Sequence, residues 1–362
     1  MESDSTFNQA RGWLKTCIEQ HEGCKSSVHQ DFIPTRLLHI TGSFDKPIEL
    51  VEKGDIPADV SYATLSHCWG QNVLHSLTTL NFDDLKSGIS RSSICKTFVD
   101  AIKVAQELGL SYLWIDSLCI IQDSTKDWNR ESVQMHNIYG KSTYNIAATS
   151  AKNGSVGCFR RREPSLLRPS KLHFDKDWRL SAEHTDGKNV LYLTDVDEWW
   201  RRFDQEPLLQ RAWVVQERAL SPRVLHYEWD QLVWECNHLT ASERYPNGLD
   251  KLTPSHKPKL RQQVDAERRI AQEKHIPGLA LKDIWRPALE AYTATAITKN
   301  SDRLVALHGV GMRIQEAFGW DYVAGMFPTN NLVSQMLWRP KGTGIARRPD
   351  IRIAPSWSWV SI

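Results

Sequence analysis

A glutamate on a predicted helix stands where an apolar side chain is expected. Trp128, Glu131, Met135 and Ile138 recur at helical spacing, which places the Glu131 carboxylate inside an apolar stripe. A buried carboxylate must be paired, protonated or directed into a cleft. Glu131 therefore either forms a salt bridge with an arginine or acts beside Trp128, where it would bind a ribose hydroxyl or stabilise a cation.

A second predicted helix repeats this pattern. Leu209, Trp213, Glu217 and Leu220 share a face, and again a glutamate follows a tryptophan into an apolar stripe. Glu217 and its neighbour Arg218 allow two interpretations. They form an ion-pair network that docks the helix on the core, or they line a ligand site in which Arg218 offers charge to a phosphate.

Polar side chains follow the predicted strand Tyr112–Ile115. This strand is apolar on both faces, as a central parallel strand is, and ligands of α/β proteins bind where such strands end. Asp116 either caps a helix and fixes the loop or takes part in catalysis. Cys119 is either a buried thiol or a nucleophile. Gln122 would position hydroxyl groups together with Asp116.

Ser66, His67 and Trp69 close an earlier strand predicted over Tyr62–Cys68. Adjacent strand residues point to opposite faces, so Ser66 and His67 cannot form a catalytic Ser-His pair with each other. His67 either donates to a ligand phosphate or is a loop histidine with its own partners. Trp69, like Trp128, offers a ring on which a ligand could stack.

Cys17, His21 and Cys24 form a metal-like cluster near the N-terminus. The spacing puts all three on one face of a helix, so a zinc site is geometrically feasible. The alternative is the end of an amphipathic helix with two buried thiols. No fourth ligand is evident nearby, and we therefore expect no metal site and no bound prosthetic group.

The elements that would position these side chains alternate between strand and helix. An apolar stripe at helical period predicts a helix over Ile94–Leu110, and Ser124 with Asp127 resembles a capping box for the helix that follows. This alternation predicts a parallel, three-layer α/β core over residues 60–150. Further predicted elements are a helix over Gln9–His21, strands over Arg36–Ile40, Ile48–Val51 and Tyr144–Thr149, and a helix over Leu208–Leu220 followed by a hairpin of Val224–Trp229 and Gln231–Cys236.

We divide the chain into residues 1–58, a helix and strands that pack on the core; residues 59–236, the core domain; and residues 237–362, a helical extension. The extension has predicted helices near residues 280–298, 301–318 and 332–338, preceded by a polar stretch over Ser242–Pro277. The chain stops at an apolar, strand-like segment, Ser356–Ile362. Such an abrupt end suggests either a piece of a longer protein or a naturally minimal form.

Composition excludes several classes of protein. Of the 362 residues, 41% are hydrophobic and 24% charged, which is typical of a globular chain, and the net charge of +2 predicts neither a nucleic acid nor an anionic membrane as partner. No apolar run is long enough to cross a bilayer, and no secretory segment begins the chain. Seven scattered cysteines fit reduced thiols. We therefore expect a cytoplasmic protein.

Several blocks of sequence together resemble the fungal heterokaryon-incompatibility (HET) domain. They are Tyr62–Gly70, Tyr112–Asp123, Asp127-Trp128 with Glu131, Ile146–Ala148, Arg211–Trp213, Gln216–Arg218, Leu220–Leu225 and the terminal Trp357-Ser358-Trp359. The blocks occur in the family's order and cover about residues 60–235. His67 and Ala212 stand where the family usually has tyrosine and glycine.

This resemblance implies a fungal protein of non-self recognition whose activation leads to regulated cell death. The family has been suggested to be remotely similar to Toll/interleukin-1 receptor (TIR) domains, some of which cleave NAD. Leu65–Gly70 looks like the first-strand motif of those domains. Trp128 with Glu131 resembles their Trp-then-Glu helix, with a spacing that differs by one residue. By this likeness Glu131 would be the catalytic carboxylate.

Three functions follow as expectations. The first is an NAD glycohydrolase in which Glu131 and Asp116 are catalytic and a nucleotide is bound by Ser66, His67, Trp69, Cys119, Gln122, Trp128, Glu217 and Arg218. NAD would be a substrate and no metal is needed. The second is a non-catalytic module that signals by self-association or through an activating protein partner. The third is a protein of this type recruited to a biosynthetic gene cluster.

Overall fold

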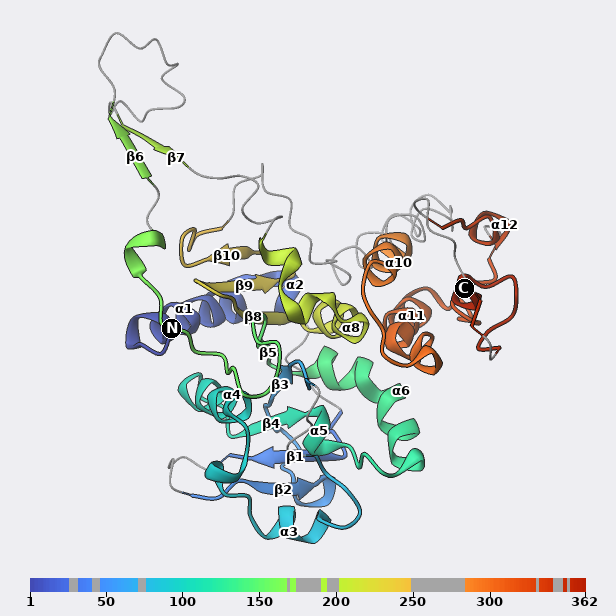
Figure 1. The fold of residues 1–362 in the computed structure, drawn as a ribbon, viewed down its shortest axis with the longest axis horizontal. Coiled ribbons are helices and arrows are strands. Elements are labelled where there is room, and N and C mark those ends of the chain that lie inside the picture. Colours follow the sequence, from blue (N-terminus) through green and yellow to red (C-terminus); the bar gives the residue numbers. More distant parts are fainter. Residues whose placement is uncertain are drawn as a thin grey trace.

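The computed structural model describes residues 1–25, 32–40, 46–70, 76–167, 170–173, 190–193, 202–248, 284–329, 332–340, 348–349 and 352–362. An eight-stranded sheet with the order β10-β9-β8-β5-β3-β4-β1-β2 crosses the molecule, and β6 pairs with β7 in a separate ribbon (Figure 1). The strands are β1 (Arg36–His39), β2 (Glu49–Glu52), β3 (Ala63–Ser66), β4 (Tyr112–Ile115), β5 (Tyr144–Ala147), β6 (Ser170–His173), β7 (Val190–Leu193), β8 (Arg223–Tyr227), β9 (Leu232–Cys236) and β10 (Thr240–Ser242).

The centre of the large sheet is parallel. β8, β5, β3 and β4 run in one direction, and β3 and β5 are buried at every residue because both faces of the sheet are covered. The predicted parallel core is therefore confirmed. The whole sheet is mixed, however, because β1, β2, β9 and β10 pair in antiparallel fashion. Residues 228–231, which join β8 to β9, are too few for the crossover that parallel strands require.

Helices cover both faces of the sheet. Figure 1 shows α1 and α4 on one face and α6 and α8 on the other, which gives the expected three layers. The hydroxyl of Ser124 caps α6 by accepting from the Asp127 amide, as predicted. The helices are α1 (Asp4–Gln20), α2 (Glu22–Lys25), α3 (Phe82–Ser87), α4 (Lys96–Glu107), α5 (Asp116–Cys119), α6 (Thr125–Lys141), α8 (Ala212–Leu220), α10 (Arg286–Thr293), α11 (Val305–Phe318) and α12 (Leu332–Met336).

The C-terminal helices pack on α8 and form a second apolar cluster. Ala212 and Ala219 of α8 lie in this cluster with residues of α10 and α11. A Cβ on Gly309 of α11 would come within 2.9 Å of the Gln216 Oε1, so glycine permits the close approach of α11 to α8. The Gly309 amide uses this closeness to donate to Gln216 Oε1 at 3.1 Å. No described helix has both the length and the apolar character needed to span a membrane.

Of two further predictions made from the sequence, one is wrong and the other concerns residues that the structure mostly does not describe. The terminal segment 356–362 is a turn that ends in a 3-10 helix (Trp359–Ser361) and not a strand, because Ser358 caps the turn and Trp359 Nε1 donates to Gly325 O. The polar stretch over Ser242–Pro277 lies mostly outside the described residues, which stop at residue 248 and resume at residue 284.

The strand order places a switch point beside β3. From β3 the chain passes through α4 to β4 on one side, and then through α6 to β5 on the other side. Open α/β sheets bind ligands at the carboxyl ends of strands where the order reverses in this way. Leu65 pairs with Ile115 in the register of β3 and β4, so Ser66 and Asp116 follow directly at neighbouring strand ends.

Candidate active site at the carboxyl ends of the parallel strands

A buried hydrogen-bond network joins the end of β3 to α8. Ser66 Oγ donates to Glu217 Oε2 and accepts from Asn145 Nδ2 of β5 at 2.9 Å. Asn145 is fixed in turn by the Thr64 hydroxyl, which donates to Asn145 Oδ1 at 3.0 Å. All of these side chains are buried, and these bonds give each of them a partner within the protein.

Glu217 is balanced between its charged and neutral forms at neutral pH. Burial raises the pKa of its carboxyl group to about 7, and the negative charge of Asp116 acts in the same direction. Hydrogen bonds from Ser66 and Tyr139 and the positive charge of Arg211 limit this rise. A carboxyl group with such a pKa is suited to accept or give a proton in a reaction near pH 7.

Asp116 is held at the end of β4 with one side open to solvent. Its Oδ2 accepts from Trp69 Nε1 at 2.9 Å and its Oδ1 accepts from the Ser117 amide at 2.7 Å. The side chain is 22% exposed, unlike that of Glu217. Asp116 thus begins the short helix α5, as the loop-fixing interpretation requires, and also presents a positioned carboxylate. Both predicted roles are compatible with this geometry.

His67 points to the other face of the sheet from Ser66. Its ring contacts Phe98 of α4 edge-on at 5.0 Å, whereas Ser66 contacts α8, as expected of adjacent strand residues. Its Nδ1 lies 3.7 Å from Asp116 Oδ1. Burial nevertheless lowers the pKa of His67 to about 4, since the Asp116 charge offsets only part of that effect. At pH 7 the imidazole is neutral, so it could meet a ligand phosphate as a hydrogen-bond donor but not as a cation.

Arg211 is a cation beside this network whose role was not predicted from the sequence. It precedes α8, is half-buried, and donates from Nη1 to His67 O. Its charge acts on both Glu217 and His67. Tyr139 and Asn145 were missed as well. The available signal for Asn145 was a polar side chain in the otherwise apolar strand β5.

Glu131 is buried in α6 with 1% exposure, as the apolar stripe predicted. Its Oε1 accepts from Arg130 Nε at 2.9 Å, which is the arginine pairing foreseen as one of its two interpretations. In the described part of the chain, no hydrogen bond or ion pair joins Glu131 to Asp116, Ser66 or Glu217. The negative charge of Asp116 acts on Glu217, whereas Glu131 is paired with Arg130.

Arg218 is engaged on the far side of α8. Its guanidinium forms two bonds of 2.7 Å with Glu235 of β9, and His226 Nε2 lies 3.0 Å from the same carboxylate. Burial would raise the pKa of Glu235, but the Arg218 charge outweighs it and holds that pKa well below its usual range. Arg218 therefore forms an ion pair, as the structural interpretation expected, but its partner is Glu235 and Glu217 lies outside this pair. The ion pair occupies the arginine that was expected to meet a phosphate.

Three other predicted ligand residues lie on the segment after β4 and on α6. Gln122 donates from Nε2 to Asp116 O at 3.1 Å and to Ile120 O at 2.9 Å, so it fixes the turn. Cys119 is fully buried, and burial raises the pKa of its thiol to about 12. Trp128 is half-buried and meets Trp213 edge-on at 6.3 Å, where α6 packs on α8. Their contacts with a ligand stay predictions.

One group of described residues has the composition of a metal site, namely Cys17, His21, Cys24 and Cys236. This group does not lie at the carboxyl ends of the parallel strands. Strand register places Cys236 opposite Arg223, and the chain of pairs through Val224, Asn145 and Thr64 puts that level at the amino ends of the parallel strands.

Comparison with known proteins agrees with the sequence blocks. Residues 62–217 match the family model described as "Heterokaryon incompatibility protein (HET)". This range includes Ser66, Asp116, Glu131 and Glu217 and excludes the cysteine cluster. Searches of curated proteins and of solved structures found no match, so the likeness to TIR domains stays a prediction. The match identifies residues 62–217 as a heterokaryon-incompatibility domain.

Proposed function

We propose that this protein promotes fungal cell death after non-self recognition by hydrolysing the glycosidic bond of NAD, and that the reaction takes place at Asp116. The observation that carries this proposal is that a carboxylate, Asp116, lies at the switch point of the sheet and that its charge acts on the buried carboxyl group of Glu217. Asp116 is positioned and partly exposed, whereas Glu217 is buried with a pKa near 7. A buried carboxyl group with a raised pKa near a partly exposed carboxylate is typical of acid–base sites.

The reaction needs little beyond these two groups. The bond from ribose C1′ to the nicotinamide nitrogen breaks, its electron pair leaves with nicotinamide, and an oxocarbenium-like ribose remains. The Asp116 carboxylate would stabilise that positive charge. Water then forms the new C1′–O bond and loses a proton, which Glu217 would accept. One NAD and one water yield ADP-ribose, nicotinamide and a proton.

Nearby residues supply the other contacts that a dinucleotide requires. Trp69 would stack on a ring while its Nε1 holds Asp116. Arg211 is proposed as the cation for the pyrophosphate in place of Arg218 and His67, because Arg218 is bound to Glu235 and His67 is neutral. Glu131, the carboxylate that the TIR likeness favours, stays a competing proposal for the catalytic group.

The test is to incubate the purified full chain with NAD and to measure free nicotinamide by chromatography. We expect release of nicotinamide and ADP-ribose in equal amounts. A lack of turnover with NAD, NADP and nicotinamide mononucleotide at millimolar concentration would contradict the enzymatic proposal. It would leave the non-catalytic, self-associating module as the function to pursue.

A further inference from the structure

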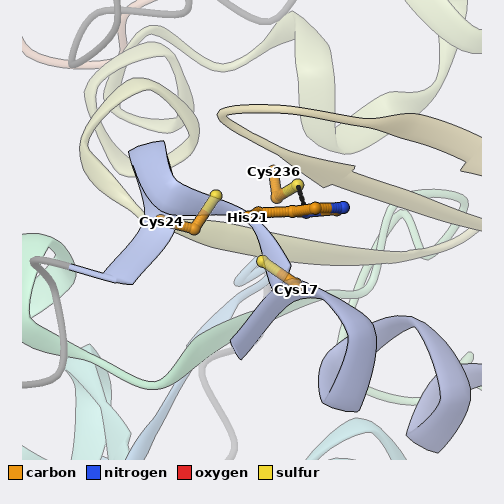
Figure 2. Close-up of side chains that lie close together, drawn as sticks. All are labelled: Cys17, His21, Cys24 and Cys236. Carbon is orange, nitrogen blue, oxygen red and sulfur yellow. Dashed lines mark hydrogen bonds between the residues drawn. The ribbon is translucent and has the colours of Figure 1, made fainter. Parts of the chain in front are cut away.

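Four buried side chains from distant parts of the chain converge near the amino ends of the parallel strands. The candidate active site lies at the opposite, carboxyl ends. Figure 2 shows Cys17 on α1, His21 between α1 and α2, Cys24 on α2 and Cys236 at the end of β9. The ligand atoms of all four residues lie within 4.8 Å of one another. Cys236 is the fourth ligand that could not be recognised from the sequence.

The local backbone departs from the single helix that was expected. α1 ends at Gln20, and His21 has extended backbone angles with φ of −87° and ψ of 98°. The chain then turns into α2, so Cys24 is not on the same helical face as Cys17. The break turns the Cys24 side chain back toward the cluster (Figure 2).

We propose that Cys17, His21, Cys24 and Cys236 bind one Zn²⁺ in a structural Cys₃His site. Zinc is held by sulfur at about 2.3 Å and by imidazole nitrogen at about 2.0 Å in a tetrahedron, whose sulfur–sulfur edges are about 3.8 Å. Ligand atoms that already lie within 4.8 Å of one another need only small rotations to reach this geometry. Four protein ligands leave no open position, which is the arrangement of a structural and not of a catalytic zinc site.

The surroundings of the sulfurs suit thiolate ligands. The Leu239 amide donates to Cys236 Sγ at 3.2 Å, and Arg223 Nε donates to Cys17 Sγ at 3.1 Å. Arg223 also donates from Nη2 to Cys24 O at 3.1 Å, so one buried guanidinium orients two of the ligand residues. Three thiolates with one Zn²⁺ carry a net charge of −1, which the positive charge of Arg223 would balance.

Such a site would fasten the N-terminal helices to the sheet. Residues 17–24 and residue 236 flank the family match over residues 62–217, so the ion would close the chain around the domain. Each thiol releases its proton to the solvent as it binds zinc, and the free energy of zinc binding adds to the free energy of folding. This inference does not depend on the proposed NAD hydrolysis, because the two sites share no residue and lie at opposite ends of the parallel strands.

The first test is the metal content of the full chain, purified under reducing conditions without a polyhistidine tag and analysed by inductively coupled plasma mass spectrometry. We expect about one Zn²⁺ per chain. Cys236→Ser should lose the zinc, and Cys158→Ser, which removes a buried thiol outside the cluster, should keep it. His21→Cys, which preserves four ligands, should also keep it.

The second test uses cobalt as a spectroscopic probe and needs no variant. The apoprotein titrated with Co²⁺ should develop thiolate-to-metal charge-transfer bands and the visible bands of a tetrahedral ion, saturating at a one-to-one ratio. Wild-type protein that contains no stoichiometric zinc and shows no such bands would overturn the proposal. A disulfide between two of the cluster cysteines, found by mass spectrometry of the protein prepared under reducing conditions, would overturn it as well.

Discussion

Ser66 at the end of β3 donates its hydroxyl hydrogen to the carboxyl group of Glu217 on α8, across 151 positions of the chain. This bond connects the parallel sheet to the helix that carries the C-terminal cluster. It also lowers the pKa of Glu217 against the opposite effect of burial. One contact therefore both joins α8 to the sheet and limits the rise in the pKa of Glu217.

Removal of the hydroxyl in Ser66→Ala should raise the pKa of Glu217 further, because one of the hydrogen bonds that favours the carboxylate is lost. The low-pH limb of the pH–rate profile for NAD hydrolysis should then move to higher pH. The loss of a buried bond to an ionisable group should also lower the free energy of unfolding by about 1.5–3 kcal/mol. Ser142→Ala, which removes another buried hydroxyl, is the control and should leave the pH profile in place. An unchanged profile in Ser66→Ala would contradict this role.

Glu217→Gln should change how stability depends on pH. The folded protein holds the Glu217 proton up to about pH 7, whereas the unfolded chain releases it near the ordinary value of 4.5. The contribution of Glu217 to stability is therefore complete below pH 4.5 and declines as the pH rises through 7. The Glu217→Gln variant should gain about 3 kcal/mol of stability relative to wild type between pH 4 and pH 8. Urea unfolding of both proteins at several pH values measures this difference, and two parallel curves would refute the raised pKa.

Arg218→Met should destabilise the fold without altering the affinity for NAD. It leaves the buried Glu235 carboxylate without its strongest partner, and breaking such a pair costs about 3–5 kcal/mol. Arg211→Met, in contrast, should raise KM for NAD because Arg211 is the cation assigned to the pyrophosphate. Thermal unfolding and steady-state kinetics of the two variants separate these effects. A raised KM in folded Arg218→Met would instead assign Arg218 to the ligand.

Trp69→Phe should lower kcat more than it raises KM. The phenyl ring retains a stacking surface, but the donor that holds Asp116 Oδ2 is lost and the carboxylate becomes free to rotate. Misplacement of a reacting group by about 1 Å can reduce the rate about 100-fold. Steady-state kinetics with NAD would show this separation, and an equal loss of binding would point to Trp69 as a ligand contact alone.

Much of the parallel core was predictable because its signals are local. The strand Tyr112–Ile115 has the predicted bounds, since an apolar run followed by polar residues ends where hydrogen bonding to the next strand ends. Ser124 was recognisable as a helix cap from its spacing to Asp127. The burial of Glu131 followed from helical periodicity alone.

The partners of the buried polar groups were not predictable in the same way. Helical period showed that Glu217 is buried, but no local pattern connects it to Ser66, which lies on another element. Arg218 was read correctly as an ion-pair candidate, yet its partner Glu235 comes from a hairpin beyond the helix. The fourth candidate zinc ligand, Cys236, is more than 200 positions away from Cys17. Spacing motifs for metal ligands connect only residues that are much closer in the sequence.

The central claim is that Asp116 and Glu217, and not Glu131, carry the reaction. The most direct measurement is kcat/KM for nicotinamide release from NAD by Asp116→Asn, Glu217→Gln and Glu131→Gln, each shown to be folded by circular dichroism. Asp59→Asn and Glu107→Gln replace solvent-accessible carboxylates and serve as matched controls. The account predicts a fall of at least about 100-fold for Asp116→Asn and Glu217→Gln, with Glu131→Gln near the controls. Full activity in Asp116→Asn together with a loss in Glu131→Gln would contradict it and assign the reaction to α6.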